Sequence, residues 1–301
     1  MSSGEVEFSV PNAGKPCKTW YQVIGDLQSK SRPLVALHGG PGASHEYLIT
    51  LSTLNRSYDI PVILYDQLGN GKSTHLPEKA GDVAFWTVDL FLRELDNLLS
   101  HLGINGDYDL LGHSWGGMLA ACHAVRQPSG LKRLIIASSP ASMELWVSAQ
   151  SVLRSKLDPG IQDILTKHEE AGTTESKEYE DAVEVFYKRF LCTMDPWPES
   201  LVATMNSTKE DPTVYLTMNG PNEFYITGSL RTWSVVRDLD RINVPTLLTN
   251  GRFDEAQDST MLPFFQRIPK VKWVTLEKSS HTAHQEEQER YIEVLHQFLT
   301  V

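Results

Sequence analysis

The chain has 301 residues, of which 41% are hydrophobic and 22% are charged, a composition typical of globular proteins rather than of disordered, collagenous or disulfide-stapled chains. A formal net charge of -11, with 27 Lys and Arg residues against 38 Asp and Glu residues and no Lys/Arg-rich run, argues against nucleic acid as a partner. The same balance favours cationic over anionic ligands.

The first part of the chain alternates between strand and helix patterns. VEFSV (6–10) and TWYQVIGD (19–26) alternate apolar and polar residues and predict a β-hairpin. Short apolar runs typical of strands covered on both faces follow at LVALHGG (34–40), VILYDQ (62–67), YDLLGHS (108–114) and LKRLIIASS (131–139). Helical patterns between these runs cover residues 44–57, 87–102 and 115–126. The alternation predicts a doubly wound, mostly parallel sheet.

This alternation breaks after Pro140, where amphipathic patches such as EYEDAVEVFYKRFL predict helices as far as about Val236. Strand patterns return at VPTLLTNGRFDE (244–255) and VKWVTLEKSSH (271–281), and QEEQERYIEVLHQFL (285–299) predicts a closing helix. We therefore expect an eight-stranded core domain of residues 1–140 and 237–301. A helical cap of residues 141–236 is expected to be inserted after the sixth strand.

A glycine-flanked serine lies where a predicted strand meets a predicted helix. Gly112, Ser114 and Gly116 form a G-x-S-x-G pattern between YDLL and WGGMLAACHAV, which is the context of a nucleophile elbow. Glycine is favoured beside the serine because the turn is tight. The backbone N–H of Trp115 opens the helix and is therefore placed to stabilise an oxyanion.

A serine nucleophile needs a base, and the base needs a carboxylate that orients it. In folds that carry such an elbow, the three residues follow along the chain in the order Ser, Asp or Glu, then His. Asp254 follows one late strand and His281 follows the next, so we expect both at the edge where Ser114 lies. Their rivals are Asp258, which more plausibly caps the following helix, and His284, which falls where the last helix begins.

The loop HGGPGAS (38–44) is the candidate for the rest of an oxyanion hole, with Gly39 or Gly40 supplying an N–H group. DQLGNGKS (66–73) is rich in glycine but lacks the spacing of a phosphate-binding loop, and we interpret it as a turn at the edge of the active site. His113 is expected to support the elbow rather than to perform chemistry.

The three cysteines, Cys17, Cys122 and Cys192, are an odd number without a CxxC pair, which argues against disulfides and a zinc site. The first residues contain no apolar core of signal-peptide length. No stretch of the chain reaches the roughly 18 apolar residues of a membrane span. We therefore expect a protein of the cytoplasm that has no membrane partner.

The motifs HGGPG, YDQLGNGKS, GHSWGG, MNGPNEF, GRFDE and SSH together resemble those of the proline iminopeptidases, which are serine aminopeptidases of the α/β-hydrolase fold, and of the related amino acid amidases. The resemblance runs from about Leu34 to the C-terminus and includes the cap. It implies a triad of Ser114, Asp254 and His281, with Gly40 and Trp115 as the oxyanion donors.

The resemblance also implies that Glu223 and Glu255 hold the free α-amino group of the substrate. An ammonium group is well recognised by two carboxylates, which would also exclude substrates with a blocked N-terminus. The alternative is that each glutamate is a solvated loop residue, since glutamates are rarely buried unless they are paired.

The cap is rich in aromatic residues whose role the sequence leaves open. These side chains either line an apolar pocket for proline or another first residue, or form the cap's own core: Phe186, Tyr187, Trp197, Phe224 and Tyr225. The preferred first residue and the oligomeric state are likewise left open.

We expect acyl transfer, without a metal or an organic cofactor, on a small peptide or an amino acid amide that has a free N-terminus. One alternative is an esterase, lactonase or amidase that uses the same residues on a small metabolite. A second alternative is a binding protein without activity on the same fold.

Overall fold

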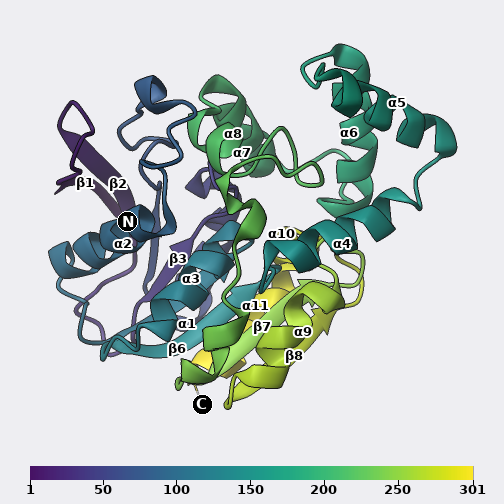
Figure 1. The fold of residues 1–301 in the computed structure, drawn as a ribbon. Coiled ribbons are helices and arrows are strands. Elements are labelled where there is room, and N and C mark those ends of the chain that lie inside the picture. Colours follow the sequence, from purple (N-terminus) through teal and green to yellow (C-terminus); the bar gives the residue numbers. More distant parts are fainter. Residues whose placement is uncertain (301) are drawn as a thin grey trace.

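An eight-stranded sheet forms the centre of the computed structural model, which describes residues 1–300 (Figure 1). The strand order is β1-β2-β4-β3-β5-β6-β7-β8. The strands β3 to β8 run parallel, whereas β1 pairs antiparallel with β2, and β2 with β4. Their bounds are Ser2–Phe8 (β1), Cys17–Ile24 (β2), Leu34–Leu37 (β3), Val62–Tyr65 (β4), Tyr108–His113 (β5), Leu131–Ala137 (β6), Thr246–Gly251 (β7) and Val271–Leu276 (β8). The predicted sheet and its opening hairpin are confirmed.

Successive residues of the short strand β3 pack against different layers of helices. Leu34 and Ala36 contact one apolar cluster, and Val35 and Leu37 contact the other. Because side chains alternate between the faces of a strand, each face of the sheet has its own core. One core includes α1 (Ser52–Tyr58) and α11 (Gln288–Thr300), and the other includes α2 (Val88–His101), α3 (Trp115–Val125) and α9 (Asp258–Arg267).

The predicted helix at residues 44–57 is divided in the structure. Residues His45–Leu51 form the 3₁₀ helix η1, and the α-helix α1 begins only at Ser52. Asp59 ends α1 in the left-handed conformation, with φ of 54°. Tighter 3₁₀ turns are common at the ends of α-helices, and the apolar pattern is similar in both. The sequence therefore did not separate the two elements.

The segment between β6 and β7 is helical throughout its regular elements. It contains α4 (Met143–Arg154), α5 (Pro159–Ala171), α6 (Lys177–Phe190), α7 (Glu199–Glu210), α8 (Thr213–Met218) and the 3₁₀ helices η3 (Ser229–Thr232) and η4 (Val236–Arg241). Figure 1 shows α5 and α6 projecting away from the sheet. The two ends of this segment meet at a bridge between Ser142 and Ser234. This narrow connection supports a cap, although the division at residues 141–236 stays a prediction.

Three of the cap aromatics belong to a separate apolar cluster inside the cap. Phe186, Tyr187 and Phe224 are buried there, and Trp197 and Tyr225 pack against the same cluster. None of the five lines the pocket beside the elbow serine. The structure therefore favours the interpretation that these aromatics stabilise the cap itself.

Cys17 and Cys192 are buried, Cys122 is partly buried, and all three are free thiols. Among the helices of residues 1–300, none combines the length and the apolar character that a bilayer crossing requires. The expected cytoplasmic location stays a prediction.

Candidate active site

The serine of the G-x-S-x-G motif lies in a sharp turn between β5 and α3. Ser114 has φ of 57° and ψ of -124°, a backbone conformation that residues other than glycine rarely adopt. A Cβ atom at Gly112 would lie 2.0 Å from the Gly116 carbonyl oxygen, and one at Gly116 would lie 2.2 Å from the Leu37 carbonyl oxygen. Both flanking glycines are therefore required for the close approach of the backbone.

The predicted acid and base meet at the same edge of the sheet as this serine. Ser114 follows β5, Asp254 follows β7 and His281 follows β8, and these strands are parallel. His281 Nδ1 lies 2.7 Å from Asp254 Oδ1. Asp254 is fully buried and also accepts hydrogen bonds from the N–H groups of Ala256 and Gly251. The carboxylate is thus fixed, and it orients the imidazole.

The structure does not join His281 to Ser114 by a hydrogen bond. Within residues 1–300 the Ser114 hydroxyl makes none, and His281 Nε2 instead lies 3.7 Å from Glu255 Oε1. The pairing of Ser114 with His281 in the triad therefore stays a prediction. Bonds between nucleophile and base commonly tighten only in the substrate complex.

The pKa of His281 reflects these negative neighbours. Burial lowers the pKa, but the charges of Asp254 and Glu255 outweigh burial and raise it to about 9. The imidazolium form is therefore favoured near neutral pH in the absence of a substrate cation. Loss of this proton is required before the imidazole can act as a base.

The two rival residues are engaged elsewhere. His284 Nε2 lies 3.1 Å from the carbonyl oxygen of Tyr47, and burial lowers the pKa of His284 to about 3. Asp258 accepts a hydrogen bond of 2.9 Å from the Asn250 side chain. Asp258 is the first residue of α9 rather than its cap, because Gln257 occupies the capping position. The expected capping role of Asp258 is therefore wrong.

His113 belongs to a buried relay that the sequence did not reveal in full. The Gly39 N–H donates to the Tyr47 hydroxyl at 2.8 Å, and that hydroxyl lies 2.8 Å from His113 Nδ1. His113 Nε2 lies 2.8 Å from the carbonyl oxygen of His281. Only the tautomer with hydrogen on Nε2 satisfies every partner. His113 thus supports the loop that contains His281 (the base loop). It also supports the elbow, in which it directly precedes Ser114.

This relay also distinguishes between the two candidate glycines of the oxyanion loop. The N–H of Gly39 is already bonded to Tyr47, whereas Gly40 lines the pocket together with Trp115. The indole of Trp115 is held separately, because its Nε1 donates to the Gln67 side chain at 2.8 Å. Gly40 and Trp115 therefore remain the candidates for the oxyanion donors. Gln67 follows β4 in the predicted turn at the edge of the site.

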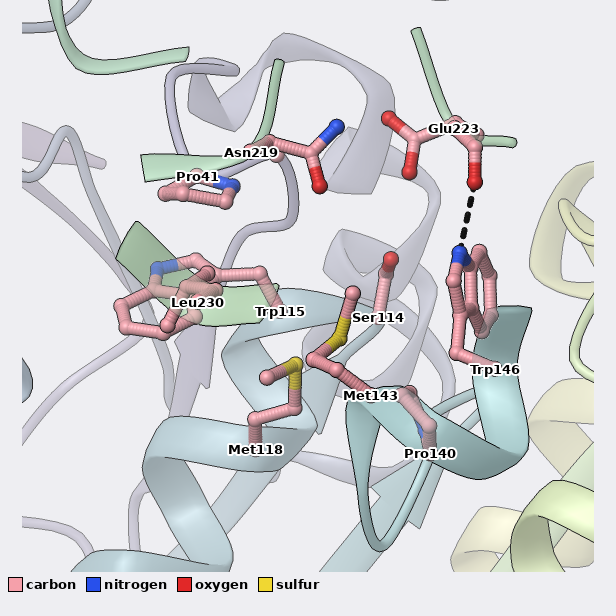
Figure 2. A pocket seen from close by; sticks show the side chains of 11 residues that line it. Pro41, Ser114, Trp115, Met118, Pro140, Met143, Trp146, Asn219, Glu223 and Leu230 are labelled. Carbon is pink, nitrogen blue, oxygen red and sulfur yellow. Dashed lines mark hydrogen bonds between the residues drawn. The ribbon is translucent and has the colours of Figure 1, made fainter. Parts of the chain in front are cut away.

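A small, largely apolar pocket lies beside the serine (Figure 2). Its apolar lining consists of Pro41, Met118, Pro140, Met143, Trp146 and Leu230. Its polar side chains are Ser114, Asn219 and Glu223, and Figure 2 shows that the Ser114 hydroxyl points into the space below the latter two. Core and cap both contribute to this pocket, which is therefore a site between them.

The two glutamates of interest are both at this site. Glu223 lines the pocket, and its carboxylate accepts a hydrogen bond of 2.7 Å from the Tyr215 hydroxyl. Glu255 is fully buried, and neither of its carboxylate oxygens has a hydrogen-bond partner within residues 1–300. Burial raises the pKa of both groups. Unpartnered buried carboxylate oxygens are costly, and a bound cation would satisfy them. The interpretation of these glutamates as solvated loop residues is therefore not supported.

A second acidic cluster lies under the turn after β4. His45 Nδ1 lies 2.8 Å from Asp66 Oδ1 and 3.7 Å from Glu46 Oε2. Asp66 also accepts hydrogen bonds from the N–H groups of His45 and Lys72. These contacts already stabilise the loop, and the cluster is a structural feature of the turn.

The chain is similar in sequence and fold to known proteins. It matches the family described as alpha/beta hydrolase fold over residues 32–288. It is 39% identical to a proline iminopeptidase of Heyndrickxia coagulans over 274 residues, which cover 91% of this chain and 92% of that protein. The crystal structure of VinJ has a TM-score of 0.93 and 50% identity, with 98% of each chain covered.

The crystal structure of a proline iminopeptidase from Mycobacterium smegmatis has a TM-score of 0.88 and 41% identity, and the match covers 98% of this chain and 97% of that one. These relatives share nearly the whole length of the chain, cap included. The chain therefore belongs to the α/β-hydrolase fold family and, within it, to the proline iminopeptidase family, and it is a serine hydrolase of the aminopeptidase type.

Proposed function

We propose that this hydrolase cleaves the amide bond after an N-terminal residue that carries a free α-amino group, in a small peptide or an amino acid amide. Ser114 is the nucleophile, His281 is the general base and acid, and Asp254 orients the imidazole. The arrangement of His281 between Asp254 and Glu255 is the observation that carries this proposal, because it combines a base with an unsatisfied anionic site.

The reaction begins when the substrate ammonium binds between Glu223 and Glu255. Neutralising these charges lowers the pKa of His281, so that the imidazole can accept the hydroxyl proton of Ser114. Ser114 attacks the carbonyl carbon, and the oxyanion accepts hydrogen bonds from the N–H groups of Gly40 and Trp115. His281 then gives the proton to the leaving amine. Water next attacks the acyl carbon, His281 takes its proton, and the proton returns to the Ser114 oxygen as the acid is released.

The pocket supports a first residue with a compact hydrocarbon side chain. Met118, Met143 and Leu230 lie on its apolar side, away from the Glu223 carboxylate. Proline fits this description, and the relatives described above are named for it. Other apolar first residues share the same chemistry, and a panel of aminoacyl amides orders them by kcat/KM.

Replacement of the nucleophile tests the proposed chemistry. Ser114→Ala should lower the release of para-nitroaniline from a free aminoacyl para-nitroanilide by at least about a thousandfold, because no other group near His281 can form the acyl-enzyme. A fluorophosphonate should label the wild type and not the variant. Ser148→Ala, on the exposed side of α4, is the matched control. Wild-type turnover by Ser114→Ala would remove the proposed triad.

The esterase and lactonase alternative predicts a different substrate dependence. Such an enzyme would cleave a simple acetyl ester as efficiently as a free aminoacyl amide. Glu223→Gln and Glu255→Gln would then reduce both activities equally. On the proposed function, these variants lose much more kcat/KM on the free aminoacyl amide.

A further inference from the structure

The helices α4 and α6 of the cap hold the main chains of both amine-binding glutamates. Each glutamate has its carbonyl oxygen bonded to a side chain of α4 and its N–H bonded to a residue of α6. The two carboxylates are not part of this frame. These main-chain bonds therefore fix where each carboxylate begins, and they use none of its oxygens; Glu223 accepts a bond from Tyr215, whereas both oxygens of Glu255 are without a hydrogen-bond partner within residues 1–300.

Glu223 is held in the loop that follows α8. The indole Nε1 of Trp146 donates to the Glu223 carbonyl oxygen at 2.6 Å, as Figure 2 shows. On the other side, the Glu223 N–H makes a long hydrogen bond of 3.4 Å to the Tyr187 hydroxyl. In Figure 2 the carboxylate of Glu223 points away from Trp146 and toward Asn219.

Glu255 is held in the same manner in the loop that follows β7. The side-chain Nε2 of Gln150 donates to the Glu255 carbonyl oxygen at 3.0 Å. The Glu255 N–H donates to the Phe190 carbonyl oxygen at 3.2 Å, and the His281 N–H donates to that same oxygen at 3.2 Å. The end of α6 therefore ties the Glu255 loop to the loop of the base.

The two α4 donors lie four residues apart on one helix and are 2% and 1% exposed, respectively, for Trp146 and Gln150. Residues at this spacing share a face and are separated by about 6 Å along the axis. A rigid helix with two buried donors thus sets how far apart the two carbonyl groups lie. An ammonium group needs both carboxylates at hydrogen-bond distance, and misplacement by about 1 Å weakens such recognition strongly.

We infer that Trp146 and Gln150 are positioning residues that set the separation of the Glu223 and Glu255 carboxylates, and thereby the selectivity for substrates with a free α-amino group. The inference rests on the proposed function, since it assigns a task to the two carboxylates. It adds that the selectivity depends on α4, which bridges a cap loop and a core loop. Without the Gln150 donor, the Glu255 loop relaxes and its carboxylate leaves the ammonium position.

Two variants remove the donors; Gln150→Leu nearly conserves the volume of the side chain, whereas Trp146→Phe also makes it smaller. Gln150→Leu keeps the size of the residue but lacks the N–H group, and Trp146→Phe keeps an aromatic ring without the indole N–H. The measured quantity is kcat/KM for prolyl para-nitroanilide divided by kcat/KM for para-nitrophenyl acetate. Each variant should lower this ratio about tenfold through a higher KM for the amide, a change of about 1.4 kcal/mol.

Competitive inhibition by pyrrolidine, a cyclic amine without an acyl group, gives a second readout. Its inhibition constant should rise in parallel with the KM for the amide in both variants. A purely structural defect would reduce both activities together and leave the ratio unchanged. Ser148→Ala on the exposed face of the same helix should keep the wild-type ratio, and thermal unfolding verifies that each variant is folded.

The outcomes separate this inference from the proposed function. If the wild type prefers the free amine and both variants keep the wild-type ratio, Trp146 and Gln150 have no positioning role. Equal losses on both substrates lead to the same conclusion. If the wild type itself cleaves prolyl and N-acetyl-prolyl para-nitroanilide equally well, the proposed function fails, and the inference fails with it.

Discussion

The environment of His281 contains several charges of one sign within a small space. Asp254 bonds to Nδ1, and Glu255 lies near Nε2, which is the nitrogen that must accept the serine proton. Further titratable groups facing the ring are Glu223, His113 and His284. Of these, the two histidines have pKa values lowered by burial and are neutral near pH 7. The carboxylates therefore determine when His281 becomes a base.

The pH dependence of ester hydrolysis follows from this residue. With para-nitrophenyl acetate, which has no ammonium group, kcat/KM should increase as pH rises through about 9, since the neutral imidazole is the active form. Glu255→Gln removes a negative charge beside Nε2, so its profile should rise at a lower pH. The measurement is the midpoint of each pH profile. An unchanged midpoint in the variant would show that Glu255 has no influence on His281.

Local sequence patterns predicted the elements that carry the site, but not all of their contacts. The spacing of Gly112, Ser114 and Gly116 predicts the elbow because the close backbone approach admits only glycine. The order of Ser114, Asp254 and His281 follows from the parallel strands that precede them. In contrast, the relay through Tyr47 joins residues that are far apart in the sequence, and no local period predicts it.

The relay connects three elements of the site: the oxyanion loop, η1 and the base loop. Tyr47→Phe leaves the Gly39 N–H and His113 Nδ1 without their partner, and these groups are buried. The free energy of unfolding should therefore fall by about 1–3 kcal/mol, which thermal or urea unfolding measures. The kcat values for free-amine and ester substrates should fall by the same factor, because the relay supports the serine and histidine rather than the amine site. A selective loss on the amine substrate would contradict this assignment.

The hydrogen bonds of the two donors on α4 could not be predicted from the sequence either. Trp146 and Gln150 lie in an amphipathic pattern that predicts a helix, and burial alone accounts for both positions. Their hydrogen bonds become evident only when the loops that contain Glu223 and Glu255 are placed beside the helix. The hydrogen bonds from α4 to these two loops therefore depend on the tertiary structure, and a local sequence pattern cannot predict them.

On the scale of the whole molecule, the pocket is built where the cap meets the sheet edge. The acidic net charge of -11 is a weak guide to the ligand, but the site concentrates negative groups at one place. Asp254 orients the base, while Glu223 and Glu255 lie within the influence of the same imidazole. On the proposed function, the fold combines acyl-transfer chemistry with recognition of a cation, which is the requirement for an aminopeptidase.

The central claim is tested most directly by kcat/KM of the wild-type enzyme for two substrates that differ only at the amine. These are prolyl para-nitroanilide and N-acetyl-prolyl para-nitroanilide, measured at the same pH and ionic strength. Acetylation removes the cation and leaves the negative charges at the site without a positive partner, so the free-amine substrate should be preferred by at least about a hundredfold. Equal values of kcat/KM for the two substrates would contradict the account.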